Sequence, residues 1–439
     1  MTLCLELAQR LQKAGQSFKM PASATVTASD FPAQANATLG VEDTLPPSAA
    51  WSAPVAPTRA RRRFLVALVA AGAGALFATW TATRTLPWFG PLLADSLRSL
   101  VGSEAVTRLE ETTADLEDRV QQVQQAVGRS QARTLDEATP SDLLAVTAKA
   151  ASAPAGNRPS DVGPMFAATA GSDDGAWQAA RVRTTDDTVL YRTIVHPDPE
   201  RLYSELFVFA LDLSRLKVHA VAGSVEPKSL DAGPSVARPG VIPEADREHL
   251  VAAFNGGFKA EHGRFGMMVD GAELLAPRPT SCTFAADQSG GLTIKRWTAL
   301  SNQASRFAWW RQTPGCMVEG GALHPGLAGA DSKNWGATLE GKTVIRRSAV
   351  GLSKDGHTLF VGISNSTTAR ALATGMQHAG AVDVAQLDVN FSFPRFLLYR
   401  EAEGTGELSA FGAVKGQLYE RDEYLGHAST RDFFYVTAD

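Results

Sequence analysis

Apolar and polar positions divide the chain into an N-terminal part with two helical signals and a C-terminal part rich in short strands. The first signal runs from Phe64 to Thr83, an uncharged segment about long enough to cross the ~30 Å hydrocarbon core of a bilayer as a helix. Four arginines within residues 59–63 precede it, and arginine on that side predicts a cytoplasmic N-terminus. We therefore expect residues 64–83 to be a single-pass transmembrane signal anchor, and nearly everything after them to be extracytoplasmic, in the periplasm or on the cell surface.

Residues 1–63 carry few large apolar side chains, and the stretch from Pro21 to Pro57 is rich in Ala, Thr, Ser and Pro. Such a segment cannot bury enough apolar surface to fold, so we expect a disordered cytoplasmic tail. A cleaved signal peptide also places arginine before an apolar run. Here the run lies deep in the chain and is longer than the usual apolar region of a signal peptide, which favours an uncleaved anchor.

The second helical signal is a set of positions that recur at alternating spacings of three and four, with Glu, Asp, Arg and Gln between them. These positions are Val106, Leu109, Thr113, Leu116, Val120, Val123 and Val127. This spacing is the a/d seam of a coiled coil, so two alternatives stand for residues 95–130. One is a short stalk through which the chain forms a homo-oligomer, and the other is an amphipathic helix lying against its own domain. Small residues, Pro and Gly dominate residues 150–175, which we expect to be a linker.

Residues 176–439 alternate short β-rich runs with Gly and Pro. Strands are expected at Leu206–Leu213, Leu216–Val221, Leu359–Ile363 and Phe433–Val436. The clearest helix is expected from Thr368 to Gly380, because apolar residues share one face and glycine is a fitting C-terminal stop. Strands outnumber helices without regular βαβ alternation, so the predicted fold class is α+β, a β-rich domain with mixed or antiparallel sheets.

Charge and cysteine content narrow the function classes. Lys and Arg number 42 against 46 Asp and Glu, a formal net charge of -4, which gives no reason to expect a polyanion such as nucleic acid. The three cysteines, Cys4, Cys282 and Cys316, lack the short spacings of a metal cluster. In an oxidising compartment Cys282 and Cys316 would either form one bridge or remain two buried thiols.

Three stretches combine glycine with polar residues in a way that core packing does not require. The first is an apolar strand that ends in Asn255, Gly256 and Gly257, where two glycines let the backbone approach a ligand closely. The second is a predicted hairpin that carries Arg346 and Arg347. These two arginines point to opposite faces of the strand, and one that faces a cleft is suited to bind phosphate.

The third stretch is an apolar strand that ends in Asp388, Asn390 and Ser392. Alternation along a strand would place these three side chains on one face, as a group of oxygens able to bind a sugar, an ion or a reacting water. Each of the three stretches, taken alone, is also explained by a turn or by a solvated strand end.

In this order and spacing the three stretches resemble the phosphodiester glycosidase family, over about Leu206 to Val436. The matching motifs are Asn255–Phe258, Asp270–Gly271, Thr313–Gly321, Arg347–Gly351, Gly380–Asp383 and Leu387–Asp388 with Ser392. The chain departs from the family where three glycines are replaced by Val389, Asn390 and Phe391. It departs again where Ile363–Asn365 stands in place of Val-Asp-Gly. The first departure reduces backbone access to a ligand, and the second removes a carboxylate and a glycine.

The resemblance implies an extracytoplasmic hydrolase of a sugar phosphodiester or a related glycosidic bond in envelope polysaccharide, with a carbohydrate or sugar phosphate as substrate. It assigns Asp388 as the catalytic carboxylate, Arg347 as the phosphate contact and Asn255 as the residue that orients the substrate. The residues expected to bind substrate around them are Gly256, Gly257, Asn390, Ser392 and Glu319.

The altered glycines favour a second interpretation, a catalytically inactive homologue that binds glycan or acts as a scaffold in the envelope. A protease or esterase is not expected, because the sequence has no GxSxG motif and Cys282 and Cys316 have no histidine paired with them by motif. No ligand spacing is diagnostic of a metal, so the sequence leaves open whether a divalent cation takes part.

Overall fold

A computed structural model describes residues 59–150, 157–185, 187–229, 237–328, 334–335, 343–402, 404 and 406–438. Most side chains before Ala70, those of Leu76 and Ser103, and those of residues 146–150 lie outside this description. Residues 1–58, which hold most of the predicted cytoplasmic tail, lie outside it as well. The chain divides into two compact units, Met1–Ala67 and Leu68–Asp439, and the second contains all the strands described here.

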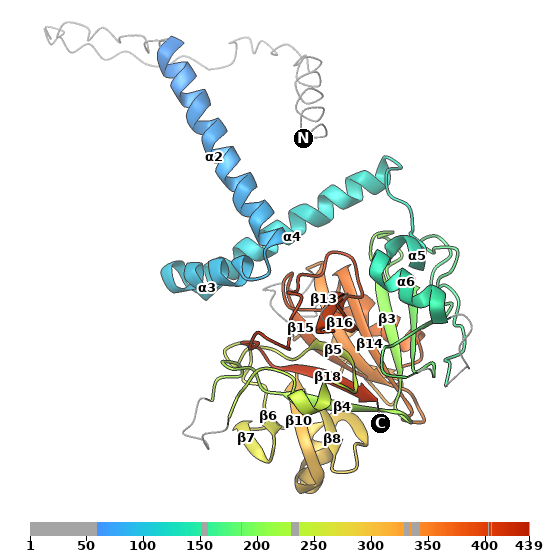
Figure 1. The fold of residues 1–439 in the computed structure, drawn as a ribbon. Coiled ribbons are helices and arrows are strands. Elements are labelled where there is room, and N and C mark those ends of the chain that lie inside the picture. The colour runs from blue at the N-terminus through green and yellow to red at the C-terminus, as the bar shows by residue number, and fades with distance from the viewer. Residues whose placement is uncertain are drawn as a thin grey trace, which may run out of the picture. The chain divides into compact units, whose positions relative to one another are not determined.

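Helices precede the first strand. They are α2 (Arg59–Thr85), α3 (Phe89–Val101), α4 (Ser103–Ala126), α5 (Leu135–Ala138) and α6 (Ser141–Ala150) (Figure 1). The predicted anchor, residues 64–83, falls inside α2, and several of its side chains, including those of Phe64–Val66, are not described. Within the described residues, none of the helices has both the length and the apolar character needed to cross a membrane. Membrane anchoring therefore stays a prediction.

The strands form three sheets in which neighbouring strands run antiparallel. The eight-stranded sheet has the order β1 (Gln178–Ala180), β2 (Leu190–Val195), β3 (Leu206–Asp212), β14 (Thr358–Thr367), β13 (Ile345–Leu352), β15 (Asp383–Val389), β11 (Val318–Glu319) and β12 (Ala322–Leu323). A five-stranded sheet has the order β7 (Ala272–Leu275), β6 (Met267–Val269), β10 (Phe307–Thr313), β8 (Cys282–Asp287) and β9 (Leu292–Arg296). The other five-stranded sheet has the order β17 (Leu408–Gly412), β16 (Phe396–Glu401), β5 (Leu250–Asn255), β18 (Phe433–Ala438) and β4 (Leu216–Val221). The remaining helices are α7 (Trp297–Leu300), α8 (Ala369–His378), η1 (Glu244–Asp246), η2 (Ser301–Arg306) and η3 (Pro325–Leu327).

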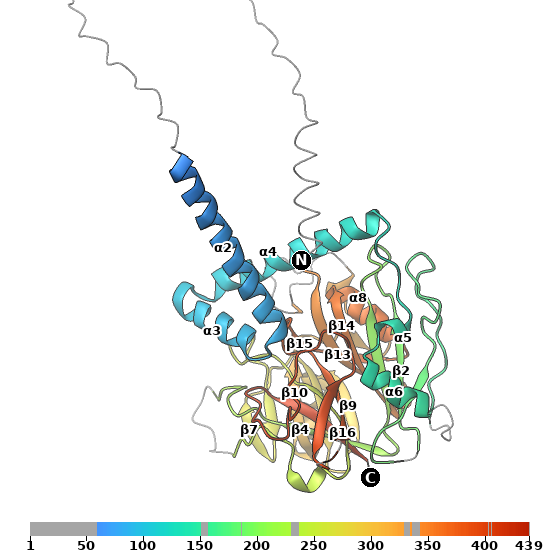
Figure 2. The same ribbon diagram turned by 45° about the horizontal axis from the view of Figure 1, so that its top comes forward.

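The main hydrophobic core receives side chains from all three sheets. Among them are Val350 and Val361 of the first, Phe284 and Trp309 of the second, and Phe254, Phe396 and Phe434 of the third. The Phe434 ring lies with its centroid 5.1 Å from that of Phe284 and 5.4 Å from that of Trp309, so aromatic contacts join the two smaller sheets. A second core lies under α8, which packs against β13 and β14 (Figure 2) through Leu372, Ala373 and Met376.

The predicted class, an α+β domain with antiparallel β-rich sheets, is confirmed. The predicted strands correspond to β3, β4, the first half of β14, and β18. The predicted helix is α8, which begins where the Thr368 hydroxyl accepts a hydrogen bond from the Ala371 backbone N–H at 3.1 Å. It ends at His378, two residues before Gly380, whose φ of 114° is accessible to glycine and strained for other residues.

The predicted linker, residues 150–175, differs from expectation where it is described, because residues 157–175 pack on the domain. The backbone N–H of Gly175 donates to the Ile194 carbonyl of β2 at 2.9 Å, and that of Val162 donates to the Gly175 carbonyl at 3.0 Å. The Asp174 side chain is buried and contacts the buried His196 imidazole at 2.8 Å. A composition typical of a linker is used here for tight turns against a sheet.

The alternatives left open for the cysteines are resolved in favour of a bridge. Cys282, the first residue of β8, and Cys316, which follows β10, form a disulfide across 34 residues. Both residues are buried in the main core. The bridge therefore links the start of β8 in the second sheet to the segment that leads into β11.

Candidate functional site

Polar residues from several strand ends meet where the eight-stranded sheet approaches the sheet that contains β5. In an antiparallel pair the end of one strand lies beside the start of its neighbour. Phe433, the first residue of β18, pairs with Asn255, the last residue of β5, so the two residues before β18 lie beside the turn after β5. We call the group formed by Asn255, Ser348, Asp388, Arg431 and Asp432 the strand-end cluster.

Asn255 joins the two sheets through its side-chain amide. Its Nδ2 donates to the Ser348 hydroxyl oxygen at 2.9 Å and to the Gly256 carbonyl at 3.1 Å, while its Oδ1 accepts from the Arg395 backbone N–H at 3.1 Å. The Ser348 hydroxyl in turn donates to the Asp388 carbonyl at 3.1 Å. The structure therefore brings Asn255 and Asp388 together, with Ser348 of β13 between them.

The Asp388 carboxylate is buried, and both oxygens accept hydrogen bonds. Oδ2 accepts from the Arg431 guanidinium at 2.7 Å and from the Asn390 amide at 3.2 Å, and Oδ1 accepts from the Val389 backbone N–H at 2.9 Å. Arg431 also donates to the Gly257 carbonyl at 2.9 Å, and its guanidinium lies 4.5 Å from the centroid of the Phe393 ring. The side chain that pairs with the predicted catalytic carboxylate is therefore Arg431.

Gly256 and Gly257 let the turn after β5 approach Asp432 closely. A Cβ on Gly256 would lie 2.2 Å from a carboxylate oxygen of Asp432, so no larger residue fits there without a shift. The Gly257 backbone N–H donates to that same oxygen at 2.9 Å. Both glycines thus let the turn pack against the buried Asp432 carboxylate. The sequence predicted that they let the backbone approach a ligand, and did not predict this contact.

Asp432 forms a buried ion pair with Arg311 of β10. The Arg311 Nε lies 2.8 Å from Oδ2 and its Nη2 lies 3.3 Å from Oδ1. Burial opposes ionisation of the carboxyl, but the Arg311 charge and its hydrogen bonds, with the Gly257 N–H, hold the pKa of Asp432 below its usual range. This ion pair links the second sheet to the strand-end cluster.

Arg347 does not join Asn255 and Asp388, and the prediction that it would do so is wrong. Its guanidinium is buried and donates to the carbonyls of Trp335, Thr343 and Thr367 at 2.7, 3.2 and 3.2 Å. The neighbouring Ser348 points to the other face of β13 and occupies the place expected for Arg347. Burial lowers the pKa of Arg347 to about 10, and its three carbonyl partners give it a structural role.

The second arginine of the hairpin, Arg346, lies closer to the cluster. It donates to the Phe391 carbonyl at 2.6 Å, to the Gly416 carbonyl at 2.7 Å and to the Asn365 side-chain oxygen at 2.9 Å. Burial, with the charges of Arg84 and Arg395, lowers the pKa of Arg346 to about 9. Its contacts stabilise the loop after β15.

The other predicted substrate-binding residues divide between this loop and a distant position. Asn390 Oδ1 accepts from the backbone N–H groups of Ser392 and Phe393 at 2.8 and 2.7 Å, so both predicted residues build the turn after Asp388. Glu319 lies elsewhere: its strand meets β15 at Val384, the opposite end from Asp388, and its carboxylate contacts Arg296 at 2.8 Å. It does not belong to the cluster.

Residues that precede the domain contact the loops next to the cluster. Two guanidinium groups lie over the Phe391 ring, with the carbon of Arg84 3.8 Å and that of Arg346 4.6 Å from its centroid. Nearby, the Lys259 ammonium contacts the Asp95 carboxylate of α3 at 2.8 Å. These contacts join the loop after β15 and the turn after β5 to the segment that precedes the domain.

His262, in the turn between β5 and β6, interacts electrostatically with Asp388 and is partly exposed to solvent. Its side chain is 39% exposed, and burial of the remainder lowers its pKa below 6.5 against the opposing charges of Asp388 and Glu261. The imidazole is therefore neutral at pH 7 and able to accept a proton.

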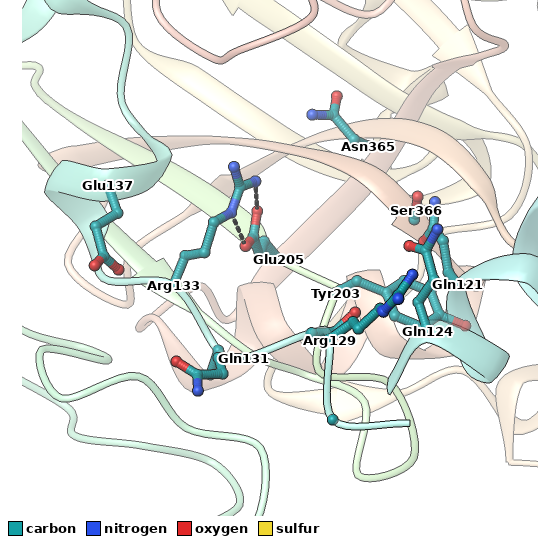
Figure 3. Close-up of a pocket in the computed structure, with 13 residues that line it drawn as sticks. Gln121, Gln124, Arg129, Gln131, Arg133, Glu137, Tyr203, Glu205, Asn365 and Ser366 are labelled. Atoms are coloured by element: carbon teal, nitrogen blue, oxygen red, sulfur yellow. Dashed lines mark hydrogen bonds and ion pairs between the residues drawn. The ribbon is translucent and has the colours of Figure 1, made fainter. Parts of the chain in front are cut away.

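A separate pocket of about 750 Å³ lies beside the C-terminal end of α4 (Figure 3). Arg133 and Glu205 form a two-point ion pair on its wall, with contacts of 2.6 and 2.5 Å, and amide side chains such as Gln124 and Asn365 also line it. No member of the strand-end cluster is among its described lining residues. In the part of the chain that the structure describes, no group of three His, Cys, Asp or Glu is arranged to hold a metal ion.

Comparisons with known proteins give a partial likeness at low similarity. No family model and no curated protein matches the chain. Among solved structures, the catalytic domain of zebrafish N-acetylglucosamine-1-phosphodiester alpha-N-acetylglucosaminidase, auto-inhibited by its pro-peptide, is 14% identical. That match covers 60% of this chain and 87% of the zebrafish chain, with a TM-score of 0.37. A hypothetical protein from Synechocystis is 11% identical over 57% of this chain and 62% of its own, less than two thirds of its length, with a TM-score of 0.36.

Sequence reasoning missed Ser348, His262, Arg431 and Asp432. The last two stand directly before the strand predicted at Phe433–Val436, so they were visible as a charged pair at a strand start. Placing them beside Asn255 requires knowing that this strand pairs antiparallel with β5, a contact between distant segments that no local pattern encodes.

Proposed function

We propose that this chain is a membrane-anchored extracytoplasmic hydrolase that cleaves a sugar phosphodiester or a related glycosidic bond in envelope polysaccharide. One observation carries the proposal: the Asp388 carboxylate, paired with Arg431 at 2.7 Å, shares a strand-end cluster with Asn255. Two of the three residues that the family resemblance assigns to catalysis are thus close together, and Arg431 takes the cationic role expected of Arg347.

The chemistry would use these groups in complementary ways. Water attacks the sugar carbon, the bond from that carbon to the phosphate oxygen breaks, and the phosphate departs with the bonding electrons. Asp388 or the neutral His262 accepts the proton of the attacking water, and Arg431 stabilises the negative charge of the departing phosphate. Asn255 and the turn at Gly256 position these groups from the end of β5.

The proposed location has support from the sequence and from the disulfide. Four arginines before residues 64–83 favour an anchor with its N-terminus in the cytoplasm. Disulfides persist in oxidising compartments, and the bridge between Cys282 and Cys316 suits a domain on the extracytoplasmic side.

A second candidate is a homologue that binds glycan without turnover. It is favoured because the polar atoms of Asn255 and the Asp388 carboxylate already bond to protein groups, and because Arg84 and Arg346 both contact the Phe391 ring. Under this alternative the cluster is a structural junction between sheets.

The substitution Asp388→Asn separates the two candidates. We expect it to lower turnover of an activated sugar phosphodiester, measured by release of a chromogenic group, at least about 100-fold, because asparagine cannot accept the proton. The control is Asp355→Asn in the exposed turn between β13 and β14, with folding of both variants checked by circular dichroism. A folded wild type without turnover would favour the binding protein, and full activity in Asp388→Asn would exclude Asp388 as the catalytic carboxylate.

The His262 imidazole predicts a pH dependence. Because burial lowers its pKa below 6.5, turnover that needs the neutral imidazole should persist as the pH falls to 6.5 and decline only below it. In His262→Gln this decline should disappear from the profile of kcat/KM against pH. The control is His427→Gln, an exposed imidazole paired with Asp422, which should leave the profile unchanged. An unchanged profile in His262→Gln would remove His262 from the mechanism.

A further inference from the structure

Helix α4 contacts its own domain with its polar face. Asp118 accepts two hydrogen bonds from the Arg201 guanidinium at 2.9 and 3.0 Å. Two helical turns further along, the Gln125 side chain donates to the Glu200 carbonyl and accepts from the Leu202 backbone N–H, both at 3.0 Å. The side chain between these two, Gln121, lines the pocket of Figure 3. These positions lie on one stripe of the helix, and that stripe is hydrophilic.

The apolar residues of α4 lie away from the domain and face solvent. The exposed fractions of these residues, with the C-cap Val127 included, range from 47% to 63%, and the residues are Leu109, Leu116, Val120, Val123 and Val127. Of the seam predicted from the sequence, only Val106 is buried. An amphipathic helix ordinarily turns its apolar stripe to the core, so the reverse orientation leaves a surface that needs a partner.

The residue types along this stripe indicate a second α4 helix as that partner. The a positions of the heptad are β-branched without exception: Val106, Thr113, Val120 and Val127. The d positions are Leu109, Leu116 and Val123. β-branched residues at a with leucine at d favour a parallel two-stranded coiled coil.

The charges of α4 disfavour a lipid surface as the partner. Residues 103–126 carry six acidic and two basic side chains, and helices that lie on membranes are instead rich in Lys and Arg. The two acidic residues that flank the stripe at e positions, Glu110 and Glu117, form ion pairs within the chain, with Arg98 and Arg84. Their charge is thus largely compensated before a second helix approaches.

The area is sufficient for a specific contact. The exposed fractions correspond to about 500 Å² of side-chain surface on each helix, or about 1,000 Å² for a pair, which reaches the lower limit for a specific interface. Every seam residue from Leu109 to Val127 is open, so this surface is accessible along more than two heptads.

We propose that two copies of this chain associate through a parallel coiled coil formed by the α4 stripe from Leu109 to Val127. Each α4 thereby contacts two surfaces, its own domain through Asp118 and Gln125, and the partner's helix through the opposite face. The inference is independent of the proposed hydrolase activity, because none of these residues belongs to the strand-end cluster.

The test is the particle mass of the full chain in detergent, measured by light scattering during size-exclusion chromatography. We expect two chains per particle for the wild type and one for Leu116→Lys. The matched control is Asp115→Lys, the adjacent exposed position outside the stripe, which should keep two chains. Circular dichroism should show that Leu116→Lys remains folded, because Leu116 is 62% exposed in the single chain.

Cysteine cross-linking tests the orientation without relying on a destabilising change. In a Cys4→Ser background, Val127→Cys should form a disulfide between two chains, since a parallel register places the two copies of this residue together. Asp115→Cys should not form one. A two-chain particle without a bridge at 127 would overturn the parallel arrangement. A wild type with one chain per particle would overturn the proposal. If Leu116→Lys then also binds more weakly than the wild type to vesicles of anionic phospholipid, the partner of the stripe is lipid.

Discussion

Replacing Asp432 with asparagine is expected to lower the free energy of unfolding of the domain by about 3–5 kcal/mol, the cost of breaking a buried ion pair on one side. Arg311 and Asp432 are 0% and 1% exposed, so water cannot compensate the remaining charge. Arg311 also donates to the Phe258 carbonyl at 2.6 Å and to the Phe265 carbonyl at 2.9 Å, which holds its guanidinium in place after the carboxylate is lost.

The measurement is denaturant unfolding at neutral pH. The control, Asp422→Asn, removes a carboxylate that is 45% exposed and pairs with His427, and should cost less than about 1 kcal/mol. The pKa of folded Asp432 lies below its usual value of 3.8, so the stabilisation is complete above pH 3.8 and is lost as the pH falls through the folded pKa. The gap between wild type and Asp432→Asn should therefore narrow only in that acidic range. Equal stability of the two proteins at neutral pH would show that the ion pair has no net role.

Removal of the disulfide is the second large effect. The double variant Cys282→Ala/Cys316→Ala should lose about 3–4 kcal/mol of unfolding free energy, because the bridge closes a loop of 34 residues and restricts the unfolded chain. Wild type treated with a reductant should fall to nearly the same value. Both alanines would lie in the buried core, which adds a smaller packing loss.

The double variant provides its own control. A reductant should leave its stability unchanged, and Cys4→Ser should behave as wild type in both conditions. Thiol titration verifies that the reductant has opened the bridge in the wild type. If the free energy of unfolding is then the same as before reduction, the bridge does not stabilise the domain by restricting the unfolded chain.

The sequence was sufficient for features that depend on neighbouring residues. Alternation and β-branched content gave the strands β3, β4 and β18, and the spacing of Leu372, Ala373 and Met376 with Thr368 before them gave α8. Asn255 and Asp388 were found for the same reason, since polar residues and glycines at the ends of apolar strands are visible locally. In the structure Asn255 and Asp388 are linked through Ser348, and Arg347 lies apart from them.

Features that depend on pairing between distant strands were not accessible. Arg347 and Ser348 are adjacent, and only the register with β14 and β15 decides which of them faces the cluster; a bulge near Arg347 shifts that register. Glu319 lies in the glycine-rich segment Thr313–Gly321, which matches a family motif, but its strand meets β15 at the end opposite Asp388. For α4, the heptad spacing identified the apolar stripe. It could not show that the opposite, polar face contacts the domain, because that contact is made with Arg201 and Glu200, far along the chain.

The position of β5 between β16 and β18 has a consequence for synthesis of the protein. β5 leaves the ribosome well before either of the strands that hydrogen-bond to its edges, because both lie near the C-terminal end of the described chain. During that interval a strand that is apolar from Leu250 to Phe254, with two unpaired edges, is open to association with other nascent chains. Productive folding should therefore depend on a holding chaperone until the last strand emerges, and slower translation of the final segment should raise the fraction that aggregates.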